Sequence, residues 1–308
     1  MGSGRWNPDD WDRHARTTAS TKPTAAHVFT SHGIQPELDP RSVKMRESRD
    51  SAANPNSTAI IIGLDVTGSM GMLADTIART GLGIVFQELI ARQPVADPHL
   101  MIAAFDDIET SAPPLQVTQF EAEVDPMTTQ IEKIFLSHNG GGNRYESSSL
   151  VHWFAAMHTS IDCFEKRGRK GYLFTVGDEG PTPMISAARM RTRFDNVPET
   201  DLTGSQMLDM ARRQWHVFHV FINESTTWPR DEREIFKVQW RSILGERLLV
   251  LDDHKALAET IVSAIQVNEG ADVKSVAGSW SGDKSVVVAR ALAGLPAAAG
   301  VGSAVERF

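Results

Sequence analysis

The chain has 308 residues, of which 41% are hydrophobic and 23% are charged, and its formal net charge at pH 7 is −8. This is the composition of a globular protein with enough apolar residues for a sizeable core. The negative charge, without a long basic stripe, argues against nucleic-acid binding. Cys163 is the only cysteine, which excludes an internal disulfide and favours a reducing compartment. We therefore expect a cytoplasmic location and interpret Cys163 as a small core residue.

The two ends of the sequence differ from its centre. The N-terminus, MGSGRWNPDDWDRH, lacks the apolar segment of a signal peptide, and no run of about 18 apolar residues predicts a membrane span. Residues 1–57 are polar and lack a sustained period, so we expect an extended arm that Trp6 and Trp11 pin to a domain. Residues 271–308 end in a Gly/Ala-rich apolar stretch, which we interpret as a docking or flexible tail. Residues 58–270 are expected to form the domain itself.

Predicted strands and helices alternate throughout this central region. Short continuous apolar runs predict strands buried on both faces at 59–64, 100–105, 171–176, 216–222 and 247–251. An alternating run at 115–120 follows two prolines and suits an edge strand. Helical patterns predict helices at 72–92, 126–136, 147–165, 202–213, 229–243 and 253–267. This alternation is typical of a Rossmann-like α/β domain, with a doubly wound, mostly parallel sheet flanked by helices.

Oxygen-bearing side chains follow the first predicted strand directly. Asp65, Thr67 and Ser69 stand at alternate positions of the loop, so all three can turn an oxygen toward one point. Ligands of open α/β sheets bind at the carboxyl ends of strands. One carboxylate and two hydroxyls are hard ligands, which suit Mg²⁺ or Mn²⁺ rather than Zn²⁺ or copper. The alternative for the two hydroxyl residues is helix capping.

This loop resembles the metal ion-dependent adhesion site (MIDAS) of the von Willebrand factor type A (vWA) family. The family pattern D-x-[ST]-x-S follows the first strand, and Asp65, Thr67 and Ser69 match its three positions. The resemblance covers about residues 58–268 and implies a vWA fold. It also implies an Asp after the fourth strand, which lies beside the first strand in the family's sheet. Asp178 follows the predicted strand at 171–176, so Asp65 and Asp178 should converge.

The family's third element is a loop residue, usually Thr, before the next helix. The loop at 140–147 reads GGGNRYES and is similar to the GGG-D-x-P-E version found in part of the family. Asn143 then takes the Thr or Asp position and can offer its carbonyl oxygen to the ion. Glu146 adds a third carboxylate. Three carboxylates around one dication leave a net negative charge, which disfavours binding of a partner's carboxylate. We therefore interpret Glu146 as acting through a water or as capping its helix, where a carboxylate meets free amides.

Two phosphate-handling interpretations fit these residues less well. Gly63 and Gly68 have the spacing of a P-loop, but Ser69 stands where the phosphate-binding Lys would be. A magnesium-dependent phosphatase of the haloacid dehalogenase type also begins with an Asp after the first strand. Thr67 replaces its general-acid Asp, however, and a hydroxyl is a poor proton donor.

The histidines do not predict a metal cluster. His152 and His158 are six residues apart, so they do not lie on the same face of a helix. The spacing of His216 and His219 places their side chains on opposite faces of a strand. We interpret each of them as a satisfied core or surface residue.

These residues predict metal-dependent protein binding without catalysis. Mg²⁺ or Mn²⁺ would be held by Asp65, Thr67, Ser69 and Asp178, supported by Asn143 or Glu146. The resemblance implies that a partner's carboxylate completes the coordination, and that the partner could be an AAA-type ATPase for which this chain is an adaptor. One alternative is a scaffold or assembly subunit, with oligomerisation through the arm and tail and a purely structural metal loop; another is a magnesium-dependent phosphohydrolase. We expect neither nucleic acid nor membrane as a partner.

Overall fold

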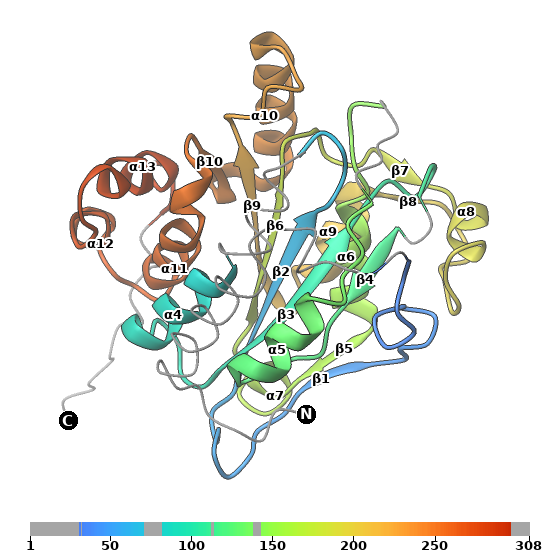
Figure 1. Cartoon of the computed structure of the whole chain (residues 1–308), viewed down its shortest axis with the longest axis horizontal. Coiled ribbons are helices and arrows are strands. Elements are labelled where there is room, and N and C mark those ends of the chain that lie inside the picture. The colour runs from blue at the N-terminus through green and yellow to red at the C-terminus, as the bar shows by residue number, and fades with distance from the viewer. Residues whose placement is uncertain (1–30, 32, 71–81, 112–113, 138–142, 297–308) are drawn as a thin grey trace, which may run out of the picture.

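The computed structural model describes residues 31, 33–70, 82–111, 114–137 and 143–296. Its centre is a six-stranded sheet with helices on both faces (Figure 1). The strands are β2 (Thr58–Asp65), β3 (Pro98–Phe105), β4 (Leu115–Val117), β6 (Gly171–Gly177), β9 (Trp215–Ile222) and β10 (Leu248–Leu251). They lie in the order β4-β3-β2-β6-β9-β10, and every neighbouring pair is parallel except β3 with β4. The expected doubly wound, mostly parallel α/β fold is confirmed, and so is the edge position of β4.

The sheet separates two apolar cores, because its strands are buried on both faces. Along β2, Ile60 and Ile62 face one core, whereas Ala59 and Ile61 face the other. The first core is covered by α4 (Leu82–Arg92), α5 (Val124–Ile131), α11 (Leu257–Asn268), α12 (Val273–Gly278) and α13 (Asp283–Ala291). The second is covered by α6 (Ser149–Met157), α7 (Asp162–Glu165), α8 (Ala187–Arg191), α9 (Gly204–Ala211) and α10 (Arg230–Leu244). Figure 1 shows α4 and α11 on one side of the sheet and α6 and α9 on the other.

The direction in which the strands are added to the sheet reverses at β2. The next strand, β3, lies on one side of β2, and β6 lies on the other. The carboxyl ends of β2 and β6 are therefore neighbours, with Leu64 paired to Val176. The expected adjacency of the strands that lead into Asp65 and Asp178 is confirmed. Ligands of open α/β sheets bind at such a switch point.

The segment predicted as one helix at 147–165 is divided, which corrects that prediction. Helix α6 ends at Met157, and β5 (Thr159–Ile161) separates it from α7. β5 pairs in parallel with β1 (Arg46–Ser48), and the Arg46 amide donates to the His158 carbonyl. Pairing with a segment far away in the sequence ends the helix, and local periodicity carries no information about such a partner.

The described part of the predicted arm covers the edge of the sheet at β4. The Val117 amide donates to the Leu38 carbonyl, and the buried guanidinium of Arg46 donates to the Val117 carbonyl over 2.8 Å. The same guanidinium donates to the Glu37 carbonyl. Unpaired backbone groups on an edge strand invite pairing with another chain. These contacts therefore give the Val117 amide and carbonyl, at the edge of the sheet, hydrogen-bond partners from the same chain.

The described part of the predicted tail contains α12 and α13. The Trp280 indole, between these helices, donates to the Ser263 hydroxyl of α11 over 2.7 Å, and the Arg92 guanidinium lies 3.2 Å from the centroid of its ring. Helix α13 also contacts β10. This part of the tail is thus packed on the first core. The domain boundaries at 57 and 270 stay predictions.

Shorter elements complete the described structure. Strands β7 (Met184–Ile185) and β8 (Leu202–Thr203) pair antiparallel, and the 3-10 helices η2 (Gly245–Arg247) and η3 (His254–Ala256) precede β10 and α11. Each helix of the described ranges is too short or too polar to cross a membrane. Several predicted features lie outside the described residues: Trp6 and Trp11, the start of the helix at 72–92, the glycines at 140–142 and the last residues of the tail.

Candidate metal centre

The predicted ligands from β2 and β6 form one chain of hydrogen bonds. Asp65 ends β2, and its Oδ1 accepts from the Thr67 amide over 2.9 Å and from the Thr67 hydroxyl over 2.7 Å. The hydroxyl oxygens of Thr67 and Ser69 lie 3.0 Å apart, and Ser69 Oγ donates to Asp178 Oδ1 over 2.9 Å. The structure therefore brings all four residues together at the switch point. We call this group, Asp65, Thr67, Ser69 and Asp178, the outer site.

Among the described residues, no donor reaches one oxygen of each carboxylate in the outer site. Asp65 is 1% exposed and Asp178 is 0% exposed. The Oδ2 atom of each is buried and has no hydrogen-bond partner in the described part of the chain. A buried carboxylate is costly unless it is hydrogen-bonded, ion-paired or bound to a metal. These two oxygens are therefore open to a further polar or charged partner.

The electrostatics of the outer site also favour a cation. Burial raises the pKa of Asp65 well above its ordinary value, and the charge of Asp178 raises it further. Burial likewise raises the pKa of Asp178, although hydrogen bonds from Ser225 and Ser69 oppose the shift. A bound dication would favour the ionised form of both groups, because an opposite charge lowers the pKa of a carboxyl.

Glu146 lies near Asp65 and does not cap its helix. The two residues line one small cavity, and Glu146 Oε2 is buried with no hydrogen-bond partner among the described residues. Burial and then the charge of Asp65 raise the pKa of Glu146 to about 11. The Ser149 amide, at the start of α6, donates over 3.3 Å to the Thr182 hydroxyl rather than to Glu146. A third carboxyl group thus stands beside the outer site.

Asn143 is oriented by a residue that the sequence interpretation missed. Its Nδ2 donates to Asp107 Oδ2 over 2.9 Å, whereas its Oδ1 is buried and has no hydrogen-bond partner in the described residues. Asp107 is fully buried and lies just after β3, the neighbour of β2. Asn143 therefore keeps available the carbonyl oxygen that the sequence interpretation assigned to the ion.

Further acidic residues at this edge were also missed. Asp106 follows β3 directly and accepts a hydrogen bond from the Ser137 hydroxyl. Glu179 follows Asp178, and its Oε1 accepts from the Trp228 indole over 3.1 Å. Burial and then the charge of Asp178 raise the pKa of Glu179 to about 7. The signal that identified Asp65, an acidic residue right after a buried strand, also marks Asp106 and Asp107.

The connection between β9 and α10 completes the edge. The Thr227 hydroxyl donates to the Ser69 carbonyl over 2.8 Å, and Ser225 bonds to Asp178. Arg144 pairs with Glu232 on α10. The site is thus assembled from segments that follow four strands, β2, β3, β6 and β9, together with the loop before α6.

Three histidines, His152, His158 and His219, differ from the expectation that each is a satisfied residue, because each has at least one buried ring nitrogen without a hydrogen-bond partner in the described ranges. His219 Nδ1 lies 2.8 Å from Thr175 Oγ1, but its Nε2 is buried without a partner in the described ranges. Both ring nitrogens of His152 are also buried and unpaired there. The predicted opposite orientation of His216 and His219 is confirmed, since they contact Tyr172 and Trp240 in different cores. His219 lines the same cavity as Asp65 and Glu146.

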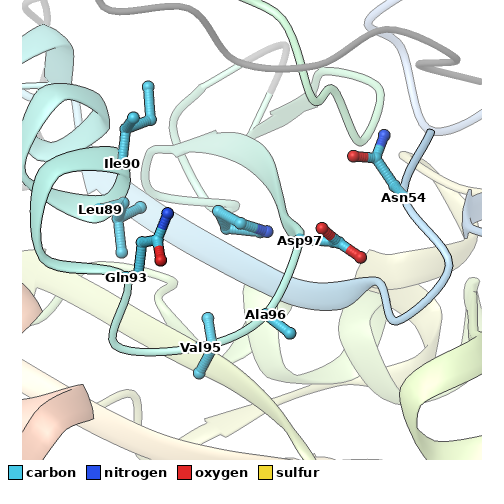
Figure 2. A pocket seen from close by; sticks show the side chains of 8 residues that line it. Asn54, Leu89, Ile90, Gln93, Val95, Ala96 and Asp97 are labelled. Atoms are coloured by element: carbon cyan, nitrogen blue, oxygen red, sulfur yellow. The ribbon is translucent and has the colours of Figure 1, made fainter.

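A larger cavity, of about 250 Å³, lies at the opposite ends of the strands. Its lining comes from the end of α4, the loop before β3 and the segment before β2, as Figure 2 shows. Leu89, Ile90 and Val95 make much of this wall apolar, and Asp97 lies at one side. Because Pro98 begins β3 whereas Asp65 ends β2, this cavity is not part of the outer site.

A separate acidic group lies after β9 and β10. One ligand atom from each of Glu224, Asp253 and His254 lies within 4.8 Å of the others. His254 Nδ1 is 2.6 Å from Glu224 Oε1, and the His254 amide also bonds to that oxygen over 2.5 Å. The group is partly exposed and bonded within itself, so it does not show the unpaired buried oxygens of the outer site.

Comparisons with known proteins give structural matches only. Neither a family model nor a curated protein matches the chain. A crystal structure of the pilus adhesin SpaC from Lactobacillus rhamnosus GG, in an open conformation, matches 74% of this chain and 31% of its own, at 10% identity and a TM-score of 0.48. A von Willebrand factor type A structure from Catenulispora acidiphila matches 78% of this chain and 49% of its own, at 14% identity and a TM-score of 0.36. This chain therefore covers only about a third of the first protein and about half of the second.

The assignment of the fold rests on topology, since both TM-scores are below 0.5. The order β4-β3-β2-β6-β9-β10, with one antiparallel edge strand, gives a mostly parallel sheet flanked by helices. The strands that lead into Asp65 and Asp178 are neighbours in that sheet. These features together make the domain vWA-like in fold.

Proposed function

We propose that this protein is a non-catalytic, metal-dependent protein-binding module whose outer site holds Mg²⁺ or Mn²⁺. The observation that carries the proposal is that Asp65, Asp178 and Asn143 each have one buried oxygen with no hydrogen-bond partner among the described residues. Protein oxygens of this kind are the ligands that hard dications prefer. The Thr67 and Ser69 hydroxyls add two neutral oxygens between the two carboxylates.

The proposed role of the ion is to bridge this chain to another protein. Asp65 and Asp178 supply charge, Thr67, Ser69 and Asn143 supply neutral oxygens, and a partner group completes the coordination. The sequence resemblance suggests a carboxylate-bearing ligand, and an AAA-type ATPase as the protein that carries it. Both partner classes belong to the proposal, as does action in the cytoplasm.

The hydroxyl contacts support a function without catalysis. Thr67 occupies the position of the general acid in phosphatases of the haloacid dehalogenase type, and its hydroxyl is bonded to Asp65 over 2.7 Å. A hydroxyl transfers protons poorly near neutral pH. A screen of phosphate esters with Mg²⁺ and with Mn²⁺ should therefore show no turnover above that of the Asp65→Ala variant.

The binding proposal is tested by partner capture from native extract in Mg²⁺ buffer. The Asp65→Ala and Asp178→Ala variants should keep their circular dichroism spectra and lose the captured partner. The matched control is Asp209→Ala on α9, because the Asp209 side chain is 71% exposed and α9 leads into the amino end of β9, whereas the outer site lies at carboxyl ends of strands. The variants test the proposal more directly than EDTA treatment does, because a chelator would also remove Mg²⁺ from a nucleotide-binding partner.

Two outcomes would contradict the proposal. Capture of the same partner by wild type and by both outer-site variants would show that the outer site does not bind that partner. A large loss of thermal stability on chelation, with capture intact, would favour the scaffold function, in which the metal only holds the loop.

A further inference from the structure

A pocket of about 140 Å³ lies beside the edge strand β4. Three segments of the chain line it, at 34–41, 114–115 and 193–194. The first belongs to the described part of the predicted arm, the second leads into β4, and the third follows α8. We call this cavity the edge pocket. It is distinct from the outer site, because none of the predicted metal ligands lines it.

Much of the wall of the edge pocket is apolar and belongs to the second core. Leu115 is 0% exposed and Phe194 is 4% exposed. The Phe194 ring also packs against Trp153 of α6, with centroids 5.2 Å apart. Ile34 and Pro114 extend this apolar surface. An apolar cavity of about 150 Å³ can hold one benzene molecule, so the edge pocket has room for a single small ring.

Arg193 brings a guanidinium without a partner to this wall. Its Nε atom is buried and has no hydrogen-bond acceptor among the described residues. Arg189, four positions earlier, pairs with Glu109 over 2.6 Å, whereas Arg193 forms no ion pair within the described ranges. A buried donor without an acceptor is costly. Arg193 is therefore open to an acceptor that the described residues do not supply.

The acidic residue in the wall does not supply this acceptor, because Arg41 occupies it. The Arg41 guanidinium donates to Asp39 Oδ2 over 3.2 Å and 3.0 Å, and the Arg41 amide donates to Asp39 Oδ1 over 2.9 Å. Hydrogen bonding to Asp39 raises the pKa of Arg41, and the charge of Asp195 adds to this rise. Of the three charged groups that line the pocket, Asp39 therefore offsets Arg41, and the charge of Arg193 is left over.

We propose that the edge pocket binds a small carboxylic acid whose body is an apolar ring. Arg193 would hold the carboxylate, because a guanidinium offers parallel N–H donors that match the two carboxylate oxygens. The apolar wall would cover the ring. A mostly apolar pocket with one charged group is typical of small-ligand sites. This inference does not depend on metal binding or partner binding at the outer site.

Ligand-observed ¹⁹F NMR with 4-fluorobenzoate tests the edge pocket. The matched probe is 4-fluorobenzamide, which has the same ring and no charge. A ligand of this size in a suitable pocket should have a dissociation constant of about 1 mM or lower. We expect wild type to bind 4-fluorobenzoate at least about 10-fold more tightly than 4-fluorobenzamide, because a hydrogen bond to a charged group contributes about that ratio.

Variants of two neighbouring arginines assign the binding to Arg193. Arg193→Gln should weaken 4-fluorobenzoate binding at least about 10-fold and leave 4-fluorobenzamide binding unchanged, so the neutral probe reports whether the pocket is still formed. Arg193→Lys keeps the charge without the paired donors and should give an intermediate affinity. The matched control is Arg191→Gln, because Arg191 is exposed and donates to the Glu199 carbonyl instead. It should bind both probes as wild type does.

Three results with wild type would overturn the proposal whatever the folding of the variants. The first is the absence of 4-fluorobenzoate binding at concentrations up to about 5 mM. The second is equal affinity for the two probes. The third is displacement of 4-fluorobenzoate by an equal concentration of inorganic phosphate, which would indicate a general anion site that makes no use of the ring. Equal weakening in Arg193→Gln and Arg191→Gln would also contradict it.

Discussion

The Ser69 hydroxyl donates to Asp178 Oδ1 over 2.9 Å, although the two residues are 109 positions apart in the sequence. The bond joins the loop after β2 to the residue after β6, and these two strands pair directly. The sheet itself therefore brings the residues of the outer site together. This arrangement predicts that loss of one charge there changes metal binding more than it changes the fold.

The Asp178→Asn variant should separate these two effects. At a Mg²⁺ concentration about 100 times the dissociation constant, wild type should gain about 2.7 kcal/mol in its free energy of unfolding. The Asn side chain keeps an acceptor for Ser69 but removes the charge, so the variant should gain less than about 0.5 kcal/mol. Urea denaturation with and without Mg²⁺ measures both values, with Asp209→Asn as the control. An equal gain in Asp178→Asn would mean that Mg²⁺ binds elsewhere.

Gly177→Ala should weaken metal binding by crowding Asp65. The added methyl carbon would meet Asp65 Oδ2 at 3.2 Å, a close contact that pushes the carboxylate away from its position. We expect Mn²⁺ affinity to fall several-fold, with a destabilisation of about 1 kcal/mol or less because the neighbouring side chain can yield. Isothermal titration measures the affinity. Gly278→Ala is the matched control, since a Cβ there meets nothing within 4 Å, and a similar loss of affinity in that variant would refute the steric explanation.

His216 should make the protein less stable in acid. Burial, and then the charges of Arg247 and Lys170, lower its pKa to about 4, whereas an unfolded histidine titrates near 6.5. The stability that this neutral histidine contributes is complete above pH 6.5 and is lost as the pH falls toward 4, because the unfolded chain binds the proton first.

The His216→Gln variant measures that contribution. Between pH 7 and pH 4.5 it should lose about 1–2 kcal/mol less unfolding free energy than wild type, a range that allows for the partial exposure of the ring. Guanidinium denaturation in EDTA at both pH values gives the difference without interference from metal binding. Parallel losses in the two proteins would show that His216 titrates normally in the folded state.

Arg46→Met should destabilise the chain through the edge of the sheet. The Arg46 side chain is buried and donates to the carbonyls of Val117 and Glu37. Methionine keeps much of the apolar stem but leaves both carbonyls without their donors, which costs about 2–3 kcal/mol. Arg41→Met is the control, because its side chain is 55% exposed and its loss should change stability by about 0.5 kcal/mol or less. If chemical denaturation gave equal losses of unfolding free energy for the two variants, the contacts of Arg46 at β4 would not stabilise the chain.

Those parts of the site that depend on the local order of residues could be predicted from the sequence. Alternate spacing placed the oxygens of Asp65, Thr67 and Ser69 in one loop, and the observed hydrogen bonds join these residues. Five continuous apolar runs and one alternating run located the six sheet strands to within a few residues. Asp178 was identified because it ends such a run, and the family resemblance supplied the neighbouring position of its strand.

The parts that could not be predicted depend on which distant segments meet. The division of the helix at 147–165 follows from pairing between β5 and β1. Asp107 orients Asn143 across 36 positions, and His219 reaches the cavity of Asp65 only because β9 lies two strands away from β2. The histidine spacing correctly predicted two opposite orientations, but it did not identify the partner of either ring.

The α/β class, the loop that carries Asp65 and the acidic residues at the strand ends follow from hydrophobic period and from neighbours in the chain, so they could be predicted without a structure. The cavity that Glu146, Glu179 and His219 share behind Asp65 could not be predicted in this way. Their convergence depends on sheet order and side-chain packing, and burial without hydrogen-bond partners becomes visible only after all the surrounding segments are in place.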